Sequence, residues 1–257
     1  MPFVTTRGTT VPYTATGTGP GLVLLHGTSG DAATHWSHLS GRFTDRRRVI
    51  VPDYAGSGES TVEDGELTLD LLVEQAVAVI GDAADAPVDL VGFSMGAVVA
   101  AATTAAHPES VRRLVLIAGW VNSDDCRFRL AFDTWARLEA IDPDLYVRVP
   151  TLLAFSPPFL SRLGDDGLAG LLAGKPAAAT LRQIRLDMRT DITAALPRIA
   201  APTLVIGCNR DFLVPVEHSR ALRDGIAGST YAELDSGHVV VHEQPDELVR
   251  LIRDFLL

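Results

Sequence analysis

Residues 88–106 read VDLVGFSMGAVVAAATTAA, and this stretch decides the fold. The run Val88 to Val91 is typical of a short buried strand, and the alanine-rich stretch Ala97 to Ala106 is typical of a tightly packed helix. Between them, Gly92-Phe93-Ser94-Met95-Gly96 places a serine on a sharp strand-to-helix turn. Such a turn needs small residues two positions before and after the serine, because its strained backbone leaves no room there for a Cβ atom. The following helix directs its N-terminal N–H groups at Ser94, so the stretch predicts a nucleophile.

Further strands are predicted by short apolar runs, which fall at Leu22–Leu25, Val49–Val51, Leu114–Ile117 and Thr203–Ile206. These runs are continuous rather than alternating, which is typical of parallel strands covered on both faces. Residues 67–84 carry apolar side chains at spacings of three and four, which predicts a helix capped by Thr68. Residues 3–16 are rich in β-branched side chains around a glycine and predict a hairpin at an antiparallel edge. We therefore expect an α/β fold with a mostly parallel sheet and helices on both faces.

Residues 120–200 break the alternation of strands and helices, because helical patterns and several prolines dominate there. We interpret this segment as an inserted, mostly helical cap. Residues 1–119 and 201–257 would then build one core around a single sheet, since the candidate catalytic residues fall in both of these parts.

The composition excludes several classes of protein. The 257 residues are 47% hydrophobic, which excludes disorder, and 22 basic against 32 acidic residues give a net charge of −10. That charge repels nucleic-acid phosphate and anionic lipid. The longest uncharged apolar stretch, 90–106, contains glycines and threonines and is too short to span a membrane, and the N-terminus does not resemble a signal peptide. We expect a cytoplasmic protein with a small-molecule substrate and no nucleic-acid or membrane partner.

The two cysteines, Cys126 and Cys208, lie far apart, and neither has another cysteine or a histidine at metal-ligand spacing beside it. Two thiols do not make a disulfide framework, so we interpret both as structural. No metal site is predicted.

A serine nucleophile requires a base, and the sequence favours His238. It lies in Asp235-Ser236-Gly237-His238, between the strand-like run 230–234 and a terminal helix predicted at 245–257. That loop, at the end of the last strand, can present an imidazole to the central strand. His242 is the alternative base, or else a polar residue that enters the last helix. His218 lies in a helical pattern that follows Pro215 and is expected at the surface.

The candidate acid is Asp211, which comes directly after the strand predicted at 203–206 and before a helix predicted from Val214. Short strand-to-helix loops of this kind carry catalytic carboxylates in open α/β sheets. A helix-capping role is the alternative for Asp211, and Asp124 and Asp125 are the alternative acids. The chain order Ser94, Asp211, His238 favours Asp211.

These residues identify the sequence as resembling the α/β-hydrolase superfamily, whose serine enzymes carry serine, acid and histidine in this order. The segments His26-Gly27-Thr28-Ser29-Gly30 and Pro52 to Ser60 are also similar to loops of that superfamily. The resemblance covers residues 22–123 and 200–257 and leaves the cap unmatched. It implies an eight-stranded, mostly parallel twisted sheet, no metal or organic cofactor, and an oxyanion hole formed by the backbone N–H groups of Met95 and Thr28. It also implies structural roles for His26 and Asp53 in their loops.

Two residues differ from those of particular enzymes in this superfamily, and they limit the reactions expected of this chain. Thr28 stands where relatives that act as haloperoxidases or dehalogenases often have an aromatic residue. Ser94 argues against dehalogenases and epoxide hydrolases, which use an aspartate nucleophile. We expect His238 to take the Ser94 proton while Ser94 attacks an acyl carbonyl, with Asp211 orienting His238 and water releasing the acyl group.

Substrate choice is expected to lie in the cap. Phe128, Phe132 and Trp135 recur at helical spacing, and Tyr146 and Phe155 add apolar surface, so we predict that these five bind substrate at an apolar entrance. An ester, thioester or lactone of small to medium apolar size is favoured. The alternatives are a lyase or eliminase on the same fold and a non-catalytic small-molecule receptor, since fold does not settle reaction. A monomer or a homodimer is expected.

Overall fold

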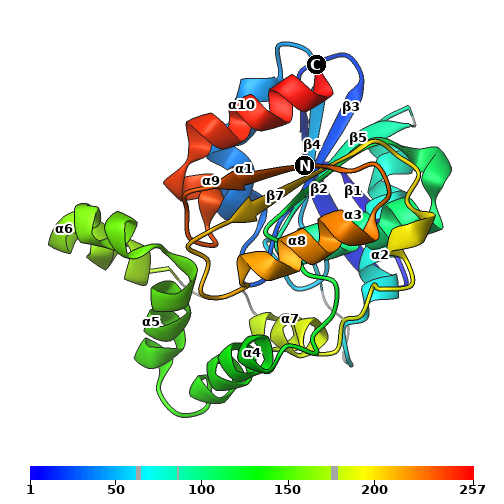
Figure 1. The fold of residues 1–257 in the computed structure, drawn as a ribbon. Coiled ribbons are helices and arrows are strands. Elements are labelled where there is room, and N and C mark those ends of the chain that lie inside the picture. The colour runs from blue at the N-terminus through cyan, green and yellow to red at the C-terminus, as the bar shows by residue number, and fades with distance from the viewer. Residues whose placement is uncertain (62–64, 86, 175–178) are drawn as a thin grey trace.

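The computed structural model describes residues 1–257 apart from 62–64, 86 and 175–178. Within the described residues, eight strands form one twisted sheet in the order β1-β2-β4-β3-β5-β6-β7-β8 (Figure 1). The strands are β1 (Phe3–Thr6), β2 (Thr9–Thr16), β3 (Gly21–Leu25), β4 (Arg48–Pro52), β5 (Val88–Phe93), β6 (Val111–Ile117), β7 (Thr203–Cys208) and β8 (Thr230–Leu234). The β1–β2 and β2–β4 pairs are antiparallel, and every other pair is parallel. The predicted α/β fold, with a mostly parallel eight-stranded sheet and an N-terminal hairpin at its edge, is confirmed.

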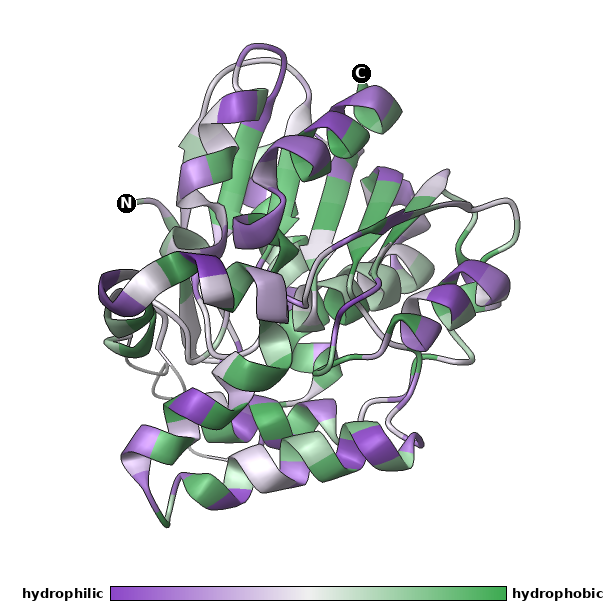
Figure 2. Cartoon of the chain, turned by 60° about the vertical axis from the view of Figure 1, so that its left-hand side comes forward, coloured by the Kyte–Doolittle hydropathy of each residue, from purple (hydrophilic) through white to green (hydrophobic). Residues whose placement is uncertain are grey.

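Helices cover both faces of the sheet. One face carries α2 (Leu69–Ala83), α3 (Met95–Ala106) and α8 (Val216–Gly225), and the other carries α1 (Ala32–Ser40), α9 (Val240–Glu243) and α10 (Pro245–Leu256). Three short 3₁₀ helices lie at Gly41–Phe43, Pro108–Ser110 and Leu196–Arg198. Neighbouring residues of a central strand enter different cores: Leu90 packs on the first face and Val91 on the second. The strands are therefore apolar at consecutive positions, and Figure 2 shows them mostly green between helices of mixed colour.

The segment between β6 and β7 holds the helices of the predicted cap. They are α4 (Cys126–Leu138), α5 (Pro143–Ala154), α6 (Pro157–Leu172) and α7 (Thr180–Asp187). The side chains of Asp125, Asp142 and Ser156 cap the first three, and a proline follows the last two of these caps, where its missing N–H costs nothing. Figure 1 shows that α6 projects away from the body, and none of its residues is buried.

Ser94 joins β5 to α3 in a strained conformation, with φ of 57°. A Cβ on Gly92 would lie 2.1 Å from the carbonyl oxygen of Gly96, and one on Gly96 would lie 2.4 Å from that of Leu25. Only glycine fits at either position, so the turn predicted from the sequence forms as a sharp strand-to-helix elbow. Although α3 carries much of the uncharged stretch, the described chain contains no helix that is both long and apolar enough to cross a membrane.

Replacing Gly92 by alanine is expected to destabilise the protein by more than about 3 kcal/mol, because the new methyl group would collide with backbone rather than with a movable side chain. Thermal unfolding followed by circular dichroism measures this as a large fall in Tm. The matched control is Gly81→Ala in α2, where no atom lies within 4 Å of the added Cβ. That variant should keep or slightly raise Tm. Equal Tm values for both variants would refute the steric explanation.

Candidate active site

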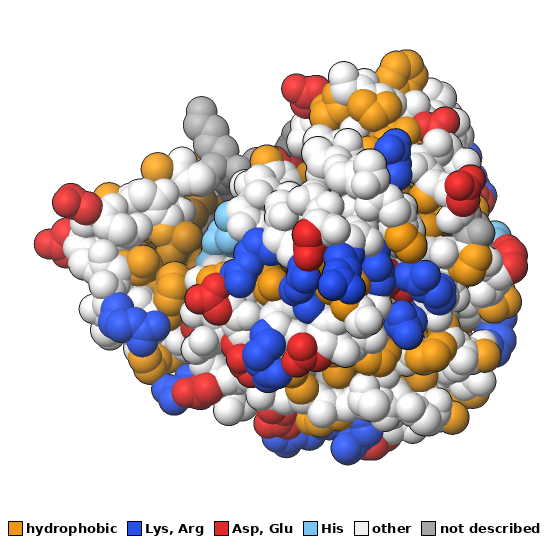
Figure 3. Space-filling model, turned by 90° about the horizontal axis from the view of Figure 1, so that it is seen from above, with side chains coloured by type: hydrophobic (Ala, Val, Ile, Leu, Met, Phe, Trp, Pro, Cys, Tyr) orange, Lys and Arg blue, Asp and Glu red, His pale blue; other side chains and the backbone are white. Residues whose placement is uncertain are grey.

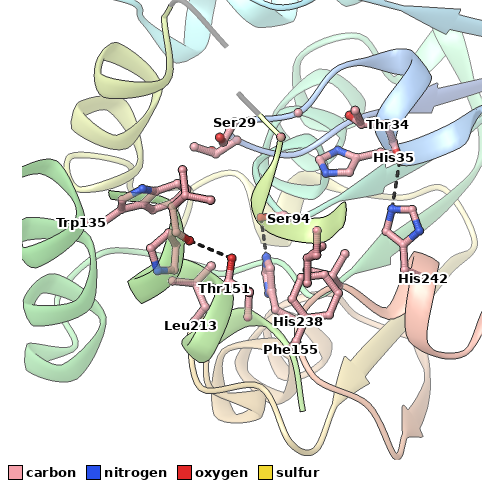
Figure 4. A pocket seen from close by; sticks show the side chains of 18 of the residues that line it. Ser29, Thr34, His35, Ser94, Trp135, Thr151, Phe155, Leu213, His238 and His242 are labelled. Carbon is pink, nitrogen blue, oxygen red and sulfur yellow. Dashed lines mark hydrogen bonds between the residues drawn. The ribbon is translucent and has the colours of Figure 1, made fainter. Parts of the chain in front are cut away.

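Three polar side chains from the ends of three strands form one chain of hydrogen bonds. Ser94 follows β5, Asp211 follows β7 and His238 follows β8. The Nε2 atom of His238 lies 2.8 Å from Ser94 Oγ, and its Nδ1 lies 2.6 Å from Asp211 Oδ2. Figure 4 shows the bond between Ser94 and His238 at the centre of a pocket. Their exposed fractions are only 5% for Ser94, 7% for Asp211 and 4% for His238, so these bonds lie in a largely water-excluded place.

The backbone around Asp211 fixes the direction of its carboxylate. Asp211 Oδ1 accepts the N–H groups of Leu213 at 2.9 Å and Val214 at 2.7 Å, which leaves Oδ2 for His238. A carboxylate beside Nδ1 keeps the imidazole proton on that nitrogen, so Nε2 is free to accept the hydroxyl proton of Ser94. This is the geometry in which a carboxylate orients an imidazole, and that role of Asp211 stays a prediction.

The loop that carries His238 packs closely against the junction of α5 and α6. A Cβ on Gly237 would lie 2.5 Å from the backbone N of Ser156 and 2.7 Å from the carbonyl oxygen of Ala154. The carboxylate of Glu243 accepts hydrogen bonds from the backbone N–H and the hydroxyl of Ser156. The junction of α5 and α6 therefore supports the histidine loop directly.

The structure does not bring the alternative base and acids to Ser94. His242 Nε2 lies 3.1 Å from the carbonyl oxygen of Thr34. Asp124 is exposed and lies near Arg129, whereas Asp125 caps α4 and its Oδ2 lies 3.2 Å from Nε2 of His218.

The surface position predicted for His218 is wrong. The side chain is 9% exposed, because the face of α8 that carries it turns toward α4, where its ring lies 5.5 Å from that of Phe128.

The loop that carries Thr28 runs alongside the nucleophile. A Cβ on Gly27 would lie 2.9 Å from Cβ of Ser94, so a side chain there would push the loop away. His26 is fully buried, stacks on Tyr54 at 4.0 Å, and its Nδ1 lies 2.9 Å from the carbonyl oxygen of Gly27. The Tyr54 hydroxyl donates to the carbonyl oxygen of His26. These contacts hold the loop, which we name the oxyanion loop (residues 26–30), next to the elbow.

The backbone N–H groups of Thr28 and Met95 make no hydrogen bond within the described chain. Met95 is the first residue of α3, so its N–H belongs to the free N-terminal turn of that helix. Two unpaired N–H groups beside a serine are what an oxyanion requires. That function stays a prediction for both residues.

A cavity of about 450 Å³ opens beside Ser94 and His238. Four of the predicted substrate-binding residues line it: Phe132, Trp135, Tyr146 and Phe155. The prediction for Phe128 needs correction, because this side chain is fully buried between Trp120 and Phe132 and does not line the cavity. Burial, together with the negative charge of Glu139, raises the pKa of the Tyr146 hydroxyl to about 12, so this hydroxyl stays protonated at neutral pH.

The cavity has an apolar side and a polar edge. Trp135, Thr151 and Leu213 lie on one side of Ser94 in Figure 4, whereas Thr34, His35 and His242 lie on the other. Figure 3 shows orange hydrophobic side chains and pale blue histidine between the projecting helices at the left and the body. Burial lowers the pKa of both His35 and His242, which keeps these imidazoles neutral at pH 7.

Sequence reasoning considered His242 only as an alternative base, and it missed Thr34, His35 and two residues of α7 that reach the oxyanion loop, Gln183 and Asp187. The capping box formed by Asp31 and Thr34 was a readable signal for the helix that carries His35. Nothing in the local sequence marks Gln183 or Asp187. Among the described residues, no three His, Cys, Asp or Glu side chains come together as metal ligands do.

Known proteins resemble the chain over almost its whole length. A family model described as the alpha/beta hydrolase family matches residues 22–251. The pyrrolizixenacetamide deacetylase of Xenorhabdus hominickii is 39% identical over 251 residues, which cover 96% of this chain and 94% of that protein. The enol-lactonase from Burkholderia xenovorans LB400 superposes with a TM-score of 0.88 at 22% identity, covering 99% of both chains. A thermophilic esterase from Thermogutta terrifontis superposes with a TM-score of 0.84 at 25% identity, covering 99% of this chain and 96% of the other.

The family match includes every strand from β3 to β8 and the three residues of the hydrogen-bonded chain. The family match also contains residues 120–200, and the deacetylase is 39% identical over 96% of this chain. The chain therefore belongs to the alpha/beta hydrolase family of enzymes.

Proposed function

We propose that this hydrolase cleaves a carboxylic ester, thioester or lactone with a small to medium apolar group, through an acyl-enzyme on Ser94. The observation that carries the proposal is the unbroken hydrogen-bond chain from Asp211 through His238 to Ser94, which opens on a largely apolar cavity. His238 Nε2 takes the proton as Ser94 Oγ bonds to the carbonyl carbon, and the N–H groups of Thr28 and Met95 stabilise the oxyanion. The leaving group departs with the proton held by His238.

Deacylation repeats these steps with water. His238 takes a proton from the water molecule as its oxygen attacks the acyl carbon, and the Ser94 oxygen leaves with that proton. Asp211 stabilises the charged imidazolium in both half-reactions.

The second candidate is hydrolysis of an N-acetyl amide. The name of the Xenorhabdus hominickii relative, at 39% identity, favours it. The same residues would act, but His238 would have to protonate a poorer leaving group, an amine nitrogen, before the carbon–nitrogen bond breaks.

The lyase and receptor alternatives differ from both candidates in one testable respect. A lyase would use His238 to remove a carbon-bound proton and would form no acyl-enzyme, and a receptor would turn nothing over. The similarity to named hydrolases supports hydrolysis over both.

The deciding experiment measures turnover and covalent labelling together. The protein is incubated with the acetate, butyrate and octanoate esters of p-nitrophenol, with a simple lactone and with the anilide p-nitroacetanilide. Separately, the protein is treated with a fluorophosphonate, from which a nucleophilic serine displaces fluoride. Intact mass spectrometry then measures the mass added to the protein. Ester or lactone turnover with a single label supports the first candidate, and turnover of the anilide in preference to every ester supports the second. Labelling without any turnover would reject both and favour the lyase.

The apolar side of the cavity leads to a further prediction. Val147 of α5 is half-buried and lines the cavity, so Val147→Trp should fill it and exclude long acyl chains. We expect kcat/KM for the octanoate ester to fall about tenfold or more relative to that for the acetate ester, which is the usual size of such steric discrimination. The control is Val149→Trp, because Val149 is half-buried on the same helix but does not line the cavity. An unchanged octanoate-to-acetate ratio in Val147→Trp would place the acyl chain elsewhere.

A further inference from the structure

Helix α7 of the cap holds the oxyanion loop through two side chains. Gln183 Oε1 accepts the backbone N–H of Ser29 at 2.9 Å, and its Nε2 donates to Ser57 Oγ at 2.9 Å. Asp187 Oδ2 accepts the hydroxyl of Thr28 at 2.7 Å. Gln183 and Asp187 are four residues apart, on one face of α7, and both are fully buried, with exposed fractions of 0%.

These contacts hold the part of the oxyanion loop in which the backbone is strained. Ser29 has a positive φ of 64°, a left-handed conformation that is costly for a residue with a Cβ. Its N–H bonds to Gln183, and the side chain of the preceding Thr28 is held by Asp187. Because the Thr28 N–H is the proposed oxyanion donor, both contacts fix the backbone on which that donor lies.

The surroundings of the Asp187 carboxyl favour its uncharged form. Its Oδ1 has no hydrogen-bond partner and it forms no salt bridge within the described part of the chain. Burial raises the pKa of its carboxyl to about 8, against the lowering effect of the Thr28 hydrogen bond.

Tyr54 and His26, in the loops that follow β4 and β3, are neutral at pH 7. Burial and the carboxylates of Asp187 and Asp53 raise the pKa of Tyr54 well above the usual value, and burial lowers the pKa of His26, which stacks on Tyr54. Asp53 has its own pKa raised by burial, and its Oδ1 accepts the backbone N–H of Ala32. The buried side chains of the neighbouring α4 are Phe128, Phe132 and Trp135, and none is ionisable. On α7 itself, Arg182 is half-buried and Arg185 is exposed, and Arg189, which follows the helix, is exposed.

We propose that Gln183 and Asp187 are positioning residues that hold the oxyanion loop against Ser94, and that Asp187 does so as a neutral carboxylic acid. This inference rests on the proposed acyl-enzyme mechanism. An ionised Asp187 would put a buried negative charge behind the Thr28 donor, where it opposes the negative charge of the oxyanion. Activity should therefore fall as Asp187 ionises, although Asp187 touches neither substrate nor Ser94.

Kinetics of four single variants, one double variant and one control variant with p-nitrophenyl butyrate test the contacts. Asp187→Leu and Gln183→Met remove the hydrogen bonds and should each lower kcat about tenfold to a hundredfold with little change in KM, because the loss falls on the transition state. Asp187→Asn keeps an acceptor for Thr28 and should retain kcat within a few-fold at pH 7. Thr28→Val should lower kcat by about as much as Asp187→Leu does. A variant that carries both substitutions should have a kcat no lower than that of either single variant. The control is Asp133→Asn, at a half-buried carboxylate of α4 that pairs with Arg137.

The pH dependence tests the charge. In the wild type, kcat/KM should decline above about pH 8, whereas in Asp187→Asn this alkaline decline should be absent.

The stability of the folded protein should also depend on the protonation of Asp187. Because the folded-state pKa of Asp187 lies above the unfolded value, its contribution is fully present below about pH 4 and is lost as the pH rises toward the folded value. Asp187→Asn should therefore raise Tm relative to the wild type at about pH 9, and the difference should shrink toward pH 5.

The outcomes separate this inference from the mechanism on which it rests. Wild-type kcat in Asp187→Leu and Gln183→Met, with Ser94→Ala inactive, would overturn the positioning role and leave the acyl-enzyme intact. Retained activity in Ser94→Ala would overturn the mechanism itself. A decline above pH 8 that persists in Asp187→Asn would overturn the role of the neutral acid. If Asp187→Leu does not fold, Thr28→Val and the pH profile of Asp187→Asn still decide the question.

Discussion

Ser94→Ala is expected to lower kcat for the best substrate by about 10⁴- to 10⁶-fold, the range found when the nucleophile of a triad is removed. The loss is large because Ser94 Oγ is the atom that forms the acyl bond, and the 2.8 Å contact with His238 has no function without it. KM should change little, since the cavity walls remain. The positive φ of Ser94 is tolerated equally badly by alanine, so stability should stay close to that of the wild type.

Steady-state kinetics and intact mass spectrometry check this expectation. The variant should also lose the fluorophosphonate label, which should be retained by the control Ser229→Ala, at a half-buried serine before β8. A Ser94→Ala protein that keeps more than about one hundredth of wild-type turnover would contradict nucleophilic catalysis by Ser94, because the oxyanion hole and binding alone leave far less.

Asp211→Asn is expected to lower kcat about 10⁴-fold while the geometry of the site persists. The hydrogen bonds that the backbone makes to this side chain explain the loss. Because the N–H groups of Leu213 and Val214 require an acceptor at Oδ1, the amide oxygen must take that position and the NH₂ group must face His238. An NH₂ group donates to Nδ1, which moves the imidazole proton to Nε2, and Nε2 then cannot accept the proton of Ser94.

The same experiment decides between the acids that the sequence left open. Asp124→Asn and Asp125→Asn should change kcat by no more than a few-fold, since Asp124 is exposed and Asp125 contacts His218 rather than His238. A loss in Asp125→Asn comparable to that in Asp211→Asn would show that the acid is supplied from the other loop. Crystallisation of Asp211→Asn would show directly whether the amide has the expected orientation.

The core of the fold could be predicted because its signals are local. Val88 to Val91 had to be a buried strand, and glycines on both sides of Ser94 left one kind of turn, which the close approach of Gly92 to Gly96 explains. The positions of Asp211 and His238 followed from strand ends, because parallel strands bring their carboxyl ends to one edge of a sheet. The structure places the three side chains in hydrogen-bond contact.

The cap could not be predicted to the same depth, because its contacts join residues far apart in sequence. Phe128 and Phe132 lie on the same helical stripe, yet only Phe132 reaches the cavity, since Trp120 covers Phe128. His218 looked exposed because the helix that buries it lies in the cap. The partners Thr28 and Asp187 are 159 residues apart, and no periodicity in either segment reports such a pairing.

The attachment of α7 to the oxyanion loop also limits how such enzymes can be recombined. A designer who wished to change specificity would exchange the whole segment between β6 and β7 for that of a relative. The result would be a chimaera whose foreign helix offers no acceptor to Thr28 or Ser29, and it would be slow with every substrate. A crossover placed before Thr180 retains Gln183 and Asp187 with their native loop, and it leaves α4, α5 and α6 as the exchangeable part.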